Sequence, residues 1–178
     1  MDIFIGGGGD DLAFLGLGVV ADVARARAAD TGRPVLYVAN GRLGRVRRAI
    51  TACAQRGEDV CLVGHSWGGP DAWRVAAWVA ARTLPIRALI TLDPVAGPLR
   101  RTFGGELACP WLNVVARPTA PDRSDRLTDI RGLSRKPSGL PTARATREVV
   151  LDLNHWNVAG MLALSDAWRW AETLQADG

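Results

Sequence analysis

The sequence predicts an α/β fold with about six mainly parallel strands and helices on both faces of the sheet. Short apolar runs alternate with longer helical patterns along the chain, which is typical of parallel strands joined by helical crossovers. The strands are apolar throughout, as expected for a sheet that is covered on both faces. The chain has 178 residues, 48% hydrophobic and 22% charged, which is typical of a globular protein. We therefore expect one domain, residues 1–178.

The first 56 residues are expected to form two strands and two helices. The apolar strand Asp2–Ile5 ends in four glycines, Gly6–Gly9. A helix is expected over Asp11–Ala29, because acidic residues favour a helix N-terminus. A Gly-Arg-Pro turn then leads into the strand Val35–Ala39. The segment Arg42–Arg56 predicts an amphipathic helix with arginines on one face.

The alternation continues after residue 56. The β-branched and apolar run Val60–Val63 predicts a strand, and Pro70–Arg82 predicts a helix with Trp and Ala side chains on a common face. The strand Arg87–Leu92 ends just before an Asp-Pro pair, and proline cannot continue a central strand. The remaining expected elements are the strands Trp111–Ala116 and Glu148–Leu153 and the closing helix Trp156–Gln175.

Residues 117–147 interrupt this pattern, because they are rich in Pro, Ser, Thr and Arg and poor in large apolar residues. The segment is too long for a plain connection, so we expect a lid, a substrate loop or a mobile insertion. It is basic and contains Lys136, the one lysine of a chain whose net charge is +4. Over a binding site it would favour an anionic substrate, although a solvated loop explains the composition equally well.

The sequence also bears on the localisation of the protein and on the roles of its cysteines. No apolar run reaches the ~18 residues of a membrane span, and the N-terminus has no basic region or cleavage site. We expect a cytoplasmic protein as synthesised, with export by a signal-less route left open. The three cysteines, Cys53, Cys61 and Cys109, have no metal-like spacing and are expected to be free, non-catalytic thiols. No nucleic-acid partner is expected, and the oligomeric state is open.

The most informative motif is Gly64-His65-Ser66-Trp67-Gly68, which lies directly between a predicted strand and a predicted helix. Gly-x-Ser-x-Gly in this context predicts a nucleophile elbow, a tight turn that presents the serine hydroxyl at the end of a sheet. The glycines are needed because a side chain would collide with neighbouring backbone. The alternative is a Gly-rich turn in which Ser66 only caps the helix.

A serine nucleophile needs a base, and the base needs an acid that orients it. Of the two histidines, His65 adjoins Ser66 and is expected to point away, whereas His155 follows the last strand. The carboxyl ends of parallel strands share one edge, so His155 should lie near Ser66. Asp93, after the strand that follows the elbow, is the expected acid. The other candidate carboxylates are Asp122 and Asp125, with Asp152 within a strand and facing elsewhere.

An oxyanion formed at Ser66 needs two hydrogen-bond donors aimed at one point. The backbone N–H of Trp67, the residue after the nucleophile, is expected to be one of them. The second is expected from the glycine-rich loop after the first strand, at Gly7 or Gly8, where the backbone can approach a substrate closely. These glycines lack the Gly-x-Gly-x-x-Gly pattern of a dinucleotide site.

Taken together, the chain resembles a compact α/β-hydrolase without a separate cap domain. Gly64–Gly68 resembles the elbow of lipases and esterases, and the segment Thr91–Pro98 resembles the region around the catalytic Asp of pancreatic-type lipases. The chain departs from the family pattern in two ways. No histidine precedes Gly6–Gly9, and no amphipathic lid is visible in the sequence.

The resemblance implies a serine hydrolase that cleaves carboxylic esters, of the lipase, phospholipase or esterase kind, through an acyl-enzyme on Ser66. Trp156 and Val95 are expected to line the substrate pocket, and neither a metal nor an organic cofactor is expected. Thioesterase, amidase and acyltransferase activities use the same Ser66, Asp93 and His155 and stay open. A non-catalytic binding domain on the same fold is the alternative of another class.

Overall fold

The computed structural model describes residues 1–10, 18–96, 103, 105–128, 136 and 138–174. Its strands are β1 (Asp2–Ile5), β2 (Val35–Val38), β3 (Cys61–His65), β4 (Ala88–Leu92), β5 (Trp111–Ala116) and β6 (Arg147–Leu151). Its helices are α1 (Val19–Thr31), α2 (Leu43–Gln55), α3 (Gly68–Ala80), α4 (Arg123–Leu127), α5 (Val158–Leu164) and α6 (Ala167–Thr173), and η2 (Thr142–Arg144) is a short 3₁₀ helix.

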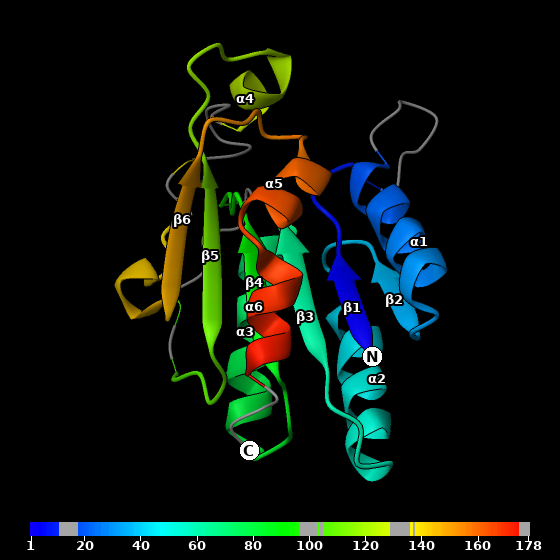
Figure 1. Cartoon of the computed structure of the whole chain (residues 1–178). Helices are drawn as coiled ribbons and strands as arrows, with labels where there is room; N and C mark the ends of the chain where they lie inside the picture. Colours follow the sequence, from blue (N-terminus) through cyan, green and yellow to red (C-terminus); the bar gives the residue numbers. More distant parts are fainter. Residues whose placement is uncertain (11–17, 97–102, 104, 129–135, 137, 175–178) are drawn as a thin grey trace.

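The strands form one six-stranded sheet in the order β2-β1-β3-β4-β5-β6 (Figure 1). Every neighbouring pair is parallel. The predicted α/β class with a parallel sheet is therefore confirmed. From β1 the chain first adds β2 on one side of β1 and then adds β3 to β6 on the other side, so the strand order reverses between β1 and β3. In sheets of this kind, ligands bind beyond the carboxyl ends of the strands near such a reversal.

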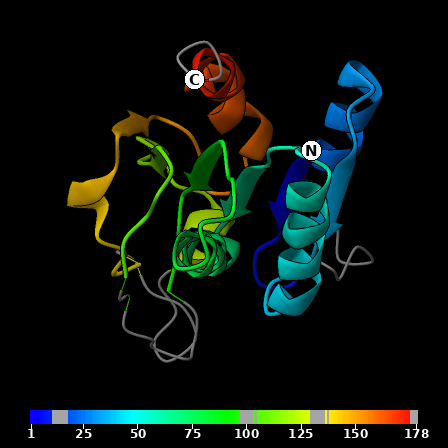
Figure 2. The same cartoon turned by 90° about the horizontal axis from the view of Figure 1, so that it is seen from below.

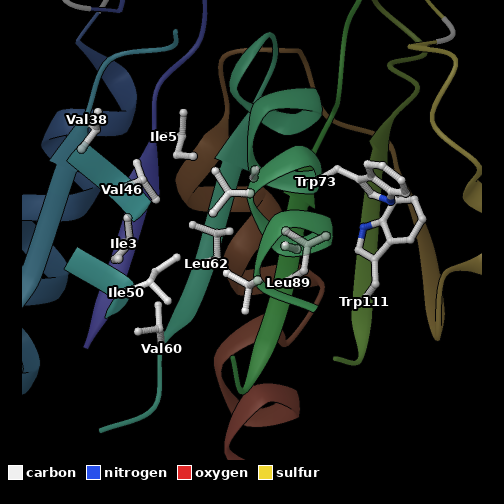
Figure 3. Packing of buried hydrophobic residues seen from close by; sticks show 14 of the residues in the cluster. Ile3, Ile5, Val38, Val46, Ile50, Val60, Leu62, Trp73, Leu89 and Trp111 are labelled. Carbon is white, nitrogen blue, oxygen red and sulfur yellow. The ribbon is translucent and has the colours of Figure 1, made fainter. Parts of the chain in front are cut away.

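Helices cover the two faces of the sheet, and each face has its own apolar core (Figure 2). On one face α2 and α3 pack on the central strands, with buried side chains such as Ile50 and Trp73 (Figure 3). On the other face α1, α5 and α6 pack on the sheet through residues such as Val20 and Met161. Residues that alternate along one strand point to opposite faces, so β3 sends Leu62 into the first core and Val63 into the second.

Two helix predictions were wrong in their extent. The first helix begins at Val19 rather than Asp11, and residues 11–17 lie outside the described part of the chain. Asp10 contributes to the start of α1 from outside it, because its carboxylate accepts a hydrogen bond from the Val20 N–H at 3.1 Å. The closing helix is divided into α5 and α6 at Asp166, whose φ of 54° interrupts the helical hydrogen-bond pattern. Gln175 lies outside the described residues.

The parallel sheet places the turns after β3, β4 and β5 and the loop after β6 at one edge of the molecule. Helix α4 lies beyond the carboxyl ends of β5 and β6 (Figure 1), so part of the predicted 117–147 insertion is at this edge. Residues 129–135 and 137 of that insertion are outside the described residues. None of the described elements forms a separate cap, and no helix among them is long and apolar enough to cross a membrane.

Candidate active site

Ser66 occupies a strained turn between β3 and α3. Its φ is 54°, in the left-handed region that residues with a side chain rarely adopt. The glycines on either side are required by space, because a Cβ on Gly64 would lie 2.3 Å from the Gly68 carbonyl oxygen. A Cβ on Gly68 would lie 2.2 Å from the Ile5 carbonyl oxygen, and real Cβ atoms do not approach backbone this closely. Helix α3 therefore starts directly after the serine and close to the sheet.

Asp93 occupies a second strained turn, at the end of β4. Its φ is 40°, and Pro94 follows it. Hydrogen bonds between the two turns hold them together: the Ser66 N–H donates to the Leu92 carbonyl at 3.1 Å, and the Val95 N–H donates to the Ser66 carbonyl at 3.1 Å. The Asp93 carboxylate is also held, since its Oδ1 accepts a hydrogen bond from the Ala116 N–H at 3.1 Å.

His155 lies in the loop between β6 and α5 and connects the other two residues. Its Nδ1 is 2.6 Å from Asp93 Oδ2, and its Nε2 is 3.0 Å from Ser66 Oγ. The carboxylate accepts from Nδ1–H, so Nε2 is the acceptor for the serine hydroxyl. Asp93 and His155 are 1% and 4% exposed, and Ser66 is 8% exposed. The structure thus brings Ser66, Asp93 and His155 together in a hydrogen-bonded chain that is almost closed to solvent.

The surroundings keep Asp93 charged although it is buried. Burial alone would raise the pKa of Asp93, but the hydrogen bond from His155 and the nearby positive charges hold it below its ordinary value. An ionised carboxylate at this point fixes the Nδ1–H tautomer of His155 and stabilises the imidazolium that forms when Nε2 takes a proton. The arrangement can therefore generate a nucleophilic serine oxygen.

The side chain of His65 contacts the loop that carries His155. The sequence did not predict this contact. The Nε2–H of His65 donates to the His155 carbonyl at 2.9 Å, and the two rings lie 4.6 Å apart. Burial and the charge of His155 lower the pKa of His65 to about 3, so it is a neutral hydrogen-bond donor. Its position holds the backbone of His155 from the side of the elbow. The sequence indicated only that a histidine directly precedes Ser66, and this did not predict its contact with His155.

The other candidate acids have different partners. Asp125 Oδ1 accepts a hydrogen bond from the His155 backbone N–H at 3.1 Å, so α4 anchors the histidine loop without contacting its ring nitrogens. Asp122 caps α4 through the Ser124 N–H. Asp152 accepts hydrogen bonds from Thr119. Of the four carboxylates considered, Asp93 alone contacts a ring nitrogen of His155 among the interactions described.

The proposed oxyanion donors lie beside Ser66. A Cβ on Gly7 would be 2.8 Å from the Ser66 Cβ and 3.3 Å from its Oγ, so the backbone after β1 passes directly against the serine. Gly8 packs on the indole of Trp67, where a Cβ would come within 2.5 Å of the ring. The N-terminal cap of α3 is Trp67, with no side-chain hydrogen bond. Ser66 is therefore not the capping side chain, while the donor roles of Trp67, Gly7 and Gly8 stay predictions.

A cavity of about 420 Å³ opens on the far side of Asp93 from the elbow, between β5, β6 and residues 136–142. Its lining is mixed: apolar side chains such as Val115 stand beside the charged Asp93, Arg117, Lys136 and Glu148. Neither Val95 nor Trp156 lines this cavity: Val95 is buried, and Trp156 is half-buried with the Arg123 guanidinium over its ring. Their predicted substrate contacts stay predictions.

Lys136 is the second residue that sequence reasoning did not connect to the site. Its ammonium forms an ion pair with Asp93 Oδ2, the same oxygen that His155 contacts. Composition alone marked it as the one lysine of a basic segment, and nothing in the sequence paired it with an acid 43 positions earlier. Among the described residues, no cluster of three or more His, Cys, Asp or Glu could hold a metal ion.

Comparisons with known proteins agree with this geometry. The model of the alpha/beta hydrolase family matches residues 7–176. Among solved structures, the chain is similar to a protein described as a hydrolase of the alpha/beta superfamily from Xanthomonas campestris pv. campestris, with 21% identity, 98% of each chain covered and a TM-score of 0.54. It is similar to a protein described as a cell surface hydrolase from Lactobacillus plantarum, with 11% identity, 98% and 94% covered and a TM-score of 0.55.

Human thioesterase 2 is also similar, with 10% identity, 98% and 95% covered and a TM-score of 0.50. At these identities the solved structures show a common fold alone. No curated protein sequence matches the chain. The family model, however, covers nearly its whole length, and the sheet order and the strained turn at Ser66 are those that such a fold requires. The chain therefore belongs to the alpha/beta hydrolase family.

Proposed function

We propose that the protein is a serine hydrolase that cleaves carboxylic esters through an acyl-enzyme on Ser66. The observation that carries the proposal is the hydrogen-bonded chain from Asp93 through His155 to Ser66, with distances of 2.6 and 3.0 Å. These distances are within the range at which a base takes a proton from a nucleophile. A domain that only binds a ligand would have no need for two strained turns that meet at one imidazole.

The reaction proceeds in two halves. Ser66 Oγ attacks the ester carbonyl carbon while His155 Nε2 takes the hydroxyl proton, which leaves a tetrahedral oxyanion. The intermediate collapses as His155 gives that proton to the departing alcohol, and Ser66 keeps the acyl group. Water then attacks the acyl carbon, His155 takes and returns its proton in the same way, and the carboxylic acid leaves with Ser66 restored. Asp93 stays ionised throughout and stabilises the imidazolium.

The oxyanion is held by backbone N–H groups on both sides of the serine. Trp67 N–H stands at the N-terminus of α3, where the helix dipole also favours negative charge. Gly7 or Gly8 supplies the second N–H, and the close passage of Gly7 against Ser66 supports this assignment. Removing one oxyanion donor from a serine hydrolase costs about 10²–10³ in kcat.

A fluorophosphonate probe tests the proposal, because it reacts covalently with an activated serine and with no ordinary one. We expect labelling of the wild-type protein, none in Ser66→Ala, and labelling slowed by at least about 10³ in His155→Ala. Ser165→Ala is the matched control, because Ser165 is buried at the end of α5 and hydrogen-bonded within its own helix. Labelling that survives Ser66→Ala would exclude the proposed nucleophile.

Thioester cleavage is the second candidate, since the same residues can perform it and human thioesterase 2 has the same fold. The two activities separate when one acyl group is offered on two leaving groups. We expect kcat/KM for a p-nitrophenyl ester to exceed that for the matching coenzyme A thioester. The opposite order would make the protein a thioesterase with the same catalytic residues.

A further inference from the structure

The catalytic acid of the proposed function has two hydrogen-bond donors, His155 and Lys136, on one oxygen atom. Asp93 Oδ2 lies 2.6 Å from His155 Nδ1 and also contacts the ammonium of Lys136. The two groups are therefore no more than about 6 Å apart, because each is one hydrogen-bond length from the shared oxygen. The Asp93 side chain is 1% exposed, whereas that of Lys136 is 27% exposed. A carboxylate in an ordinary catalytic triad needs only the first partner.

We propose that Lys136 is a positioning residue that sets the pH range over which His155 serves as the catalytic base. Its positive charge neutralises part of the carboxylate that would otherwise stabilise the imidazolium form of His155. It also repels the imidazolium directly, because like charges at this separation disfavour each other. Both effects make the imidazolium form of His155 less stable than it would be beside Asp93 alone. The inference rests on the proposed function, since a base is needed only if Ser66 is the nucleophile.

The surroundings leave Lys136 as the cation that acts most directly on this pair. Arg117 lines the same cavity at the end of β5, but the hydrogen bond of its backbone N–H is to Leu151 and its side chain is exposed. Glu148 on β6 accepts a hydrogen bond from Asn113 at 2.9 Å. Among the described residues, Asp125 is a further charged neighbour of His155, and it accepts a hydrogen bond from the backbone N–H. His65 is neutral.

The cavity next to Lys136 also bears on how the residue can be tested. Lys136 lies at the wall of an open space of about 420 Å³ that it shares with Asp93, and its side chain is 27% exposed. Its side chain is therefore not enclosed by apolar packing, and replacing it should not create a new void in either core. Lys136→Met keeps most of the unbranched side chain and removes the ammonium with its charge and hydrogen-bond donors, whereas Lys136→Arg keeps a charge and donors.

The test is the pH dependence of kcat/KM for a p-nitrophenyl ester between about pH 4 and pH 9, since its acid limb reports the free enzyme's base. We expect the midpoint of that limb to rise by about one pH unit in Lys136→Met, the lower end of the effect of a charge at 4–6 Å because the side chain is partly exposed. At pH values below the limb, kcat/KM would then be about tenfold lower than in the wild type. Lys136→Arg should return the midpoint toward the wild-type value.

Arg144→Met is the matched control, because it removes one positive charge from the same segment at an exposed position whose nearest acid is Glu106. Its profile should superimpose on that of the wild type. A purely structural role of Lys136 would lower kcat/KM by one factor at every pH without moving the midpoint. An unmoved midpoint, or one that moves equally in Arg144→Met, would overturn the proposal.

A second measurement separates this inference from the proposed function. The chain has only two histidines, so NMR can follow the His155 ring through a pH titration in the Ser66→Ala background, where no turnover occurs. We expect the titration midpoint of that ring to rise by about one pH unit when Lys136→Met is added. If the wild-type protein hydrolyses no ester, the proposed function fails, while the titration still decides whether Lys136 acts on His155. An unchanged midpoint overturns the Lys136 proposal even if the enzyme is active.

Discussion

Replacing Asp93 by Asn tests the proposed mechanism most directly, because the structure dictates how the amide would turn. The Ala116 N–H donates to Oδ1, so the amide oxygen of Asn must take that position. The NH₂ group then occupies the position of Oδ2 and faces His155 Nδ1. The Lys136 ammonium, which also only donates, turns away into solvent, because its side chain is partly exposed whereas the Ala116 N–H is fixed in the backbone. Two donors cannot share one hydrogen bond, so Nδ1 must become the acceptor. The proton moves to Nε2, which can no longer accept the proton of Ser66.

The expected loss in kcat is about 10⁴-fold, the effect of the wrong tautomer in a serine hydrolase. This corresponds to about 5.5 kcal/mol of transition-state stabilisation. The assay is steady-state hydrolysis of a p-nitrophenyl ester, with a thermal melt to establish that the variant is folded. Asp152→Asn is the matched control, since Asp152 is near His155 in sequence but binds Thr119, and it should stay within about twofold. If Asp93→Asn retains more than a tenth of wild-type activity, the acid is elsewhere, with Asp125 next to be tested.

Three further predictions concern the groups that support the site. His65→Leu should lower kcat by about 10–100-fold, because the buried His155 carbonyl loses its donor, and His65→Gln should recover part of the loss in the same assay. Gly68→Ala should lower the free energy of unfolding by at least about 2 kcal/mol in urea, whereas Gly7→Ala should affect activity more than stability, because its Cβ would meet Ser66. The lowered pKa of Asp93 means that its ionisation stabilises the fold above about pH 4 and that this stabilisation is lost as the pH falls through the folded-state pKa. Urea midpoints of the wild type should therefore fall more steeply below pH 4 than those of Asp93→Asn.

Much of the fold was predictable because strands and turns carry local signals. The apolar runs at β1, β3 and β4 are buried throughout, and a run of this kind cannot lie at a solvent-exposed edge. The point at which the closing helix divides was not predictable, because Asp166 adopts a left-handed conformation that its residue type only tolerates. At the start of α1 the Val20 N–H donates a hydrogen bond to the Asp10 carboxylate, ten positions earlier, and a contact at this separation has no local sequence signal.

The arrangement of Ser66, Asp93 and His155 could be anticipated for a topological reason. Each follows a different strand, and parallel strands bring their carboxyl ends to one edge, so chain order alone places the three together. His65 and Lys136 could not be assigned in this way. His65 contacts His155, which lies 90 positions later in a loop. Lys136 contacts Asp93 from a segment that has no regular pattern in the sequence. Hydrophobic periodicity predicts helices and strands, but it does not predict the conformation of such loops.

The two strained turns also explain why the site requires this particular fold. A left-handed Ser66 or Asp93 would cost of order 1–3 kcal/mol in isolation, so each conformation persists only where its surroundings impose it. Here each turn is imposed by the other, since the Ser66 N–H and carbonyl bind the backbone on both sides of Asp93. The proposed nucleophile and the proposed acid are therefore one structural unit, built from two adjacent parallel strands, and His155 is the separate part. Its loop is held by His65 and Asp125 from two elements, which leaves the imidazole between the strained turns with both nitrogens correctly directed.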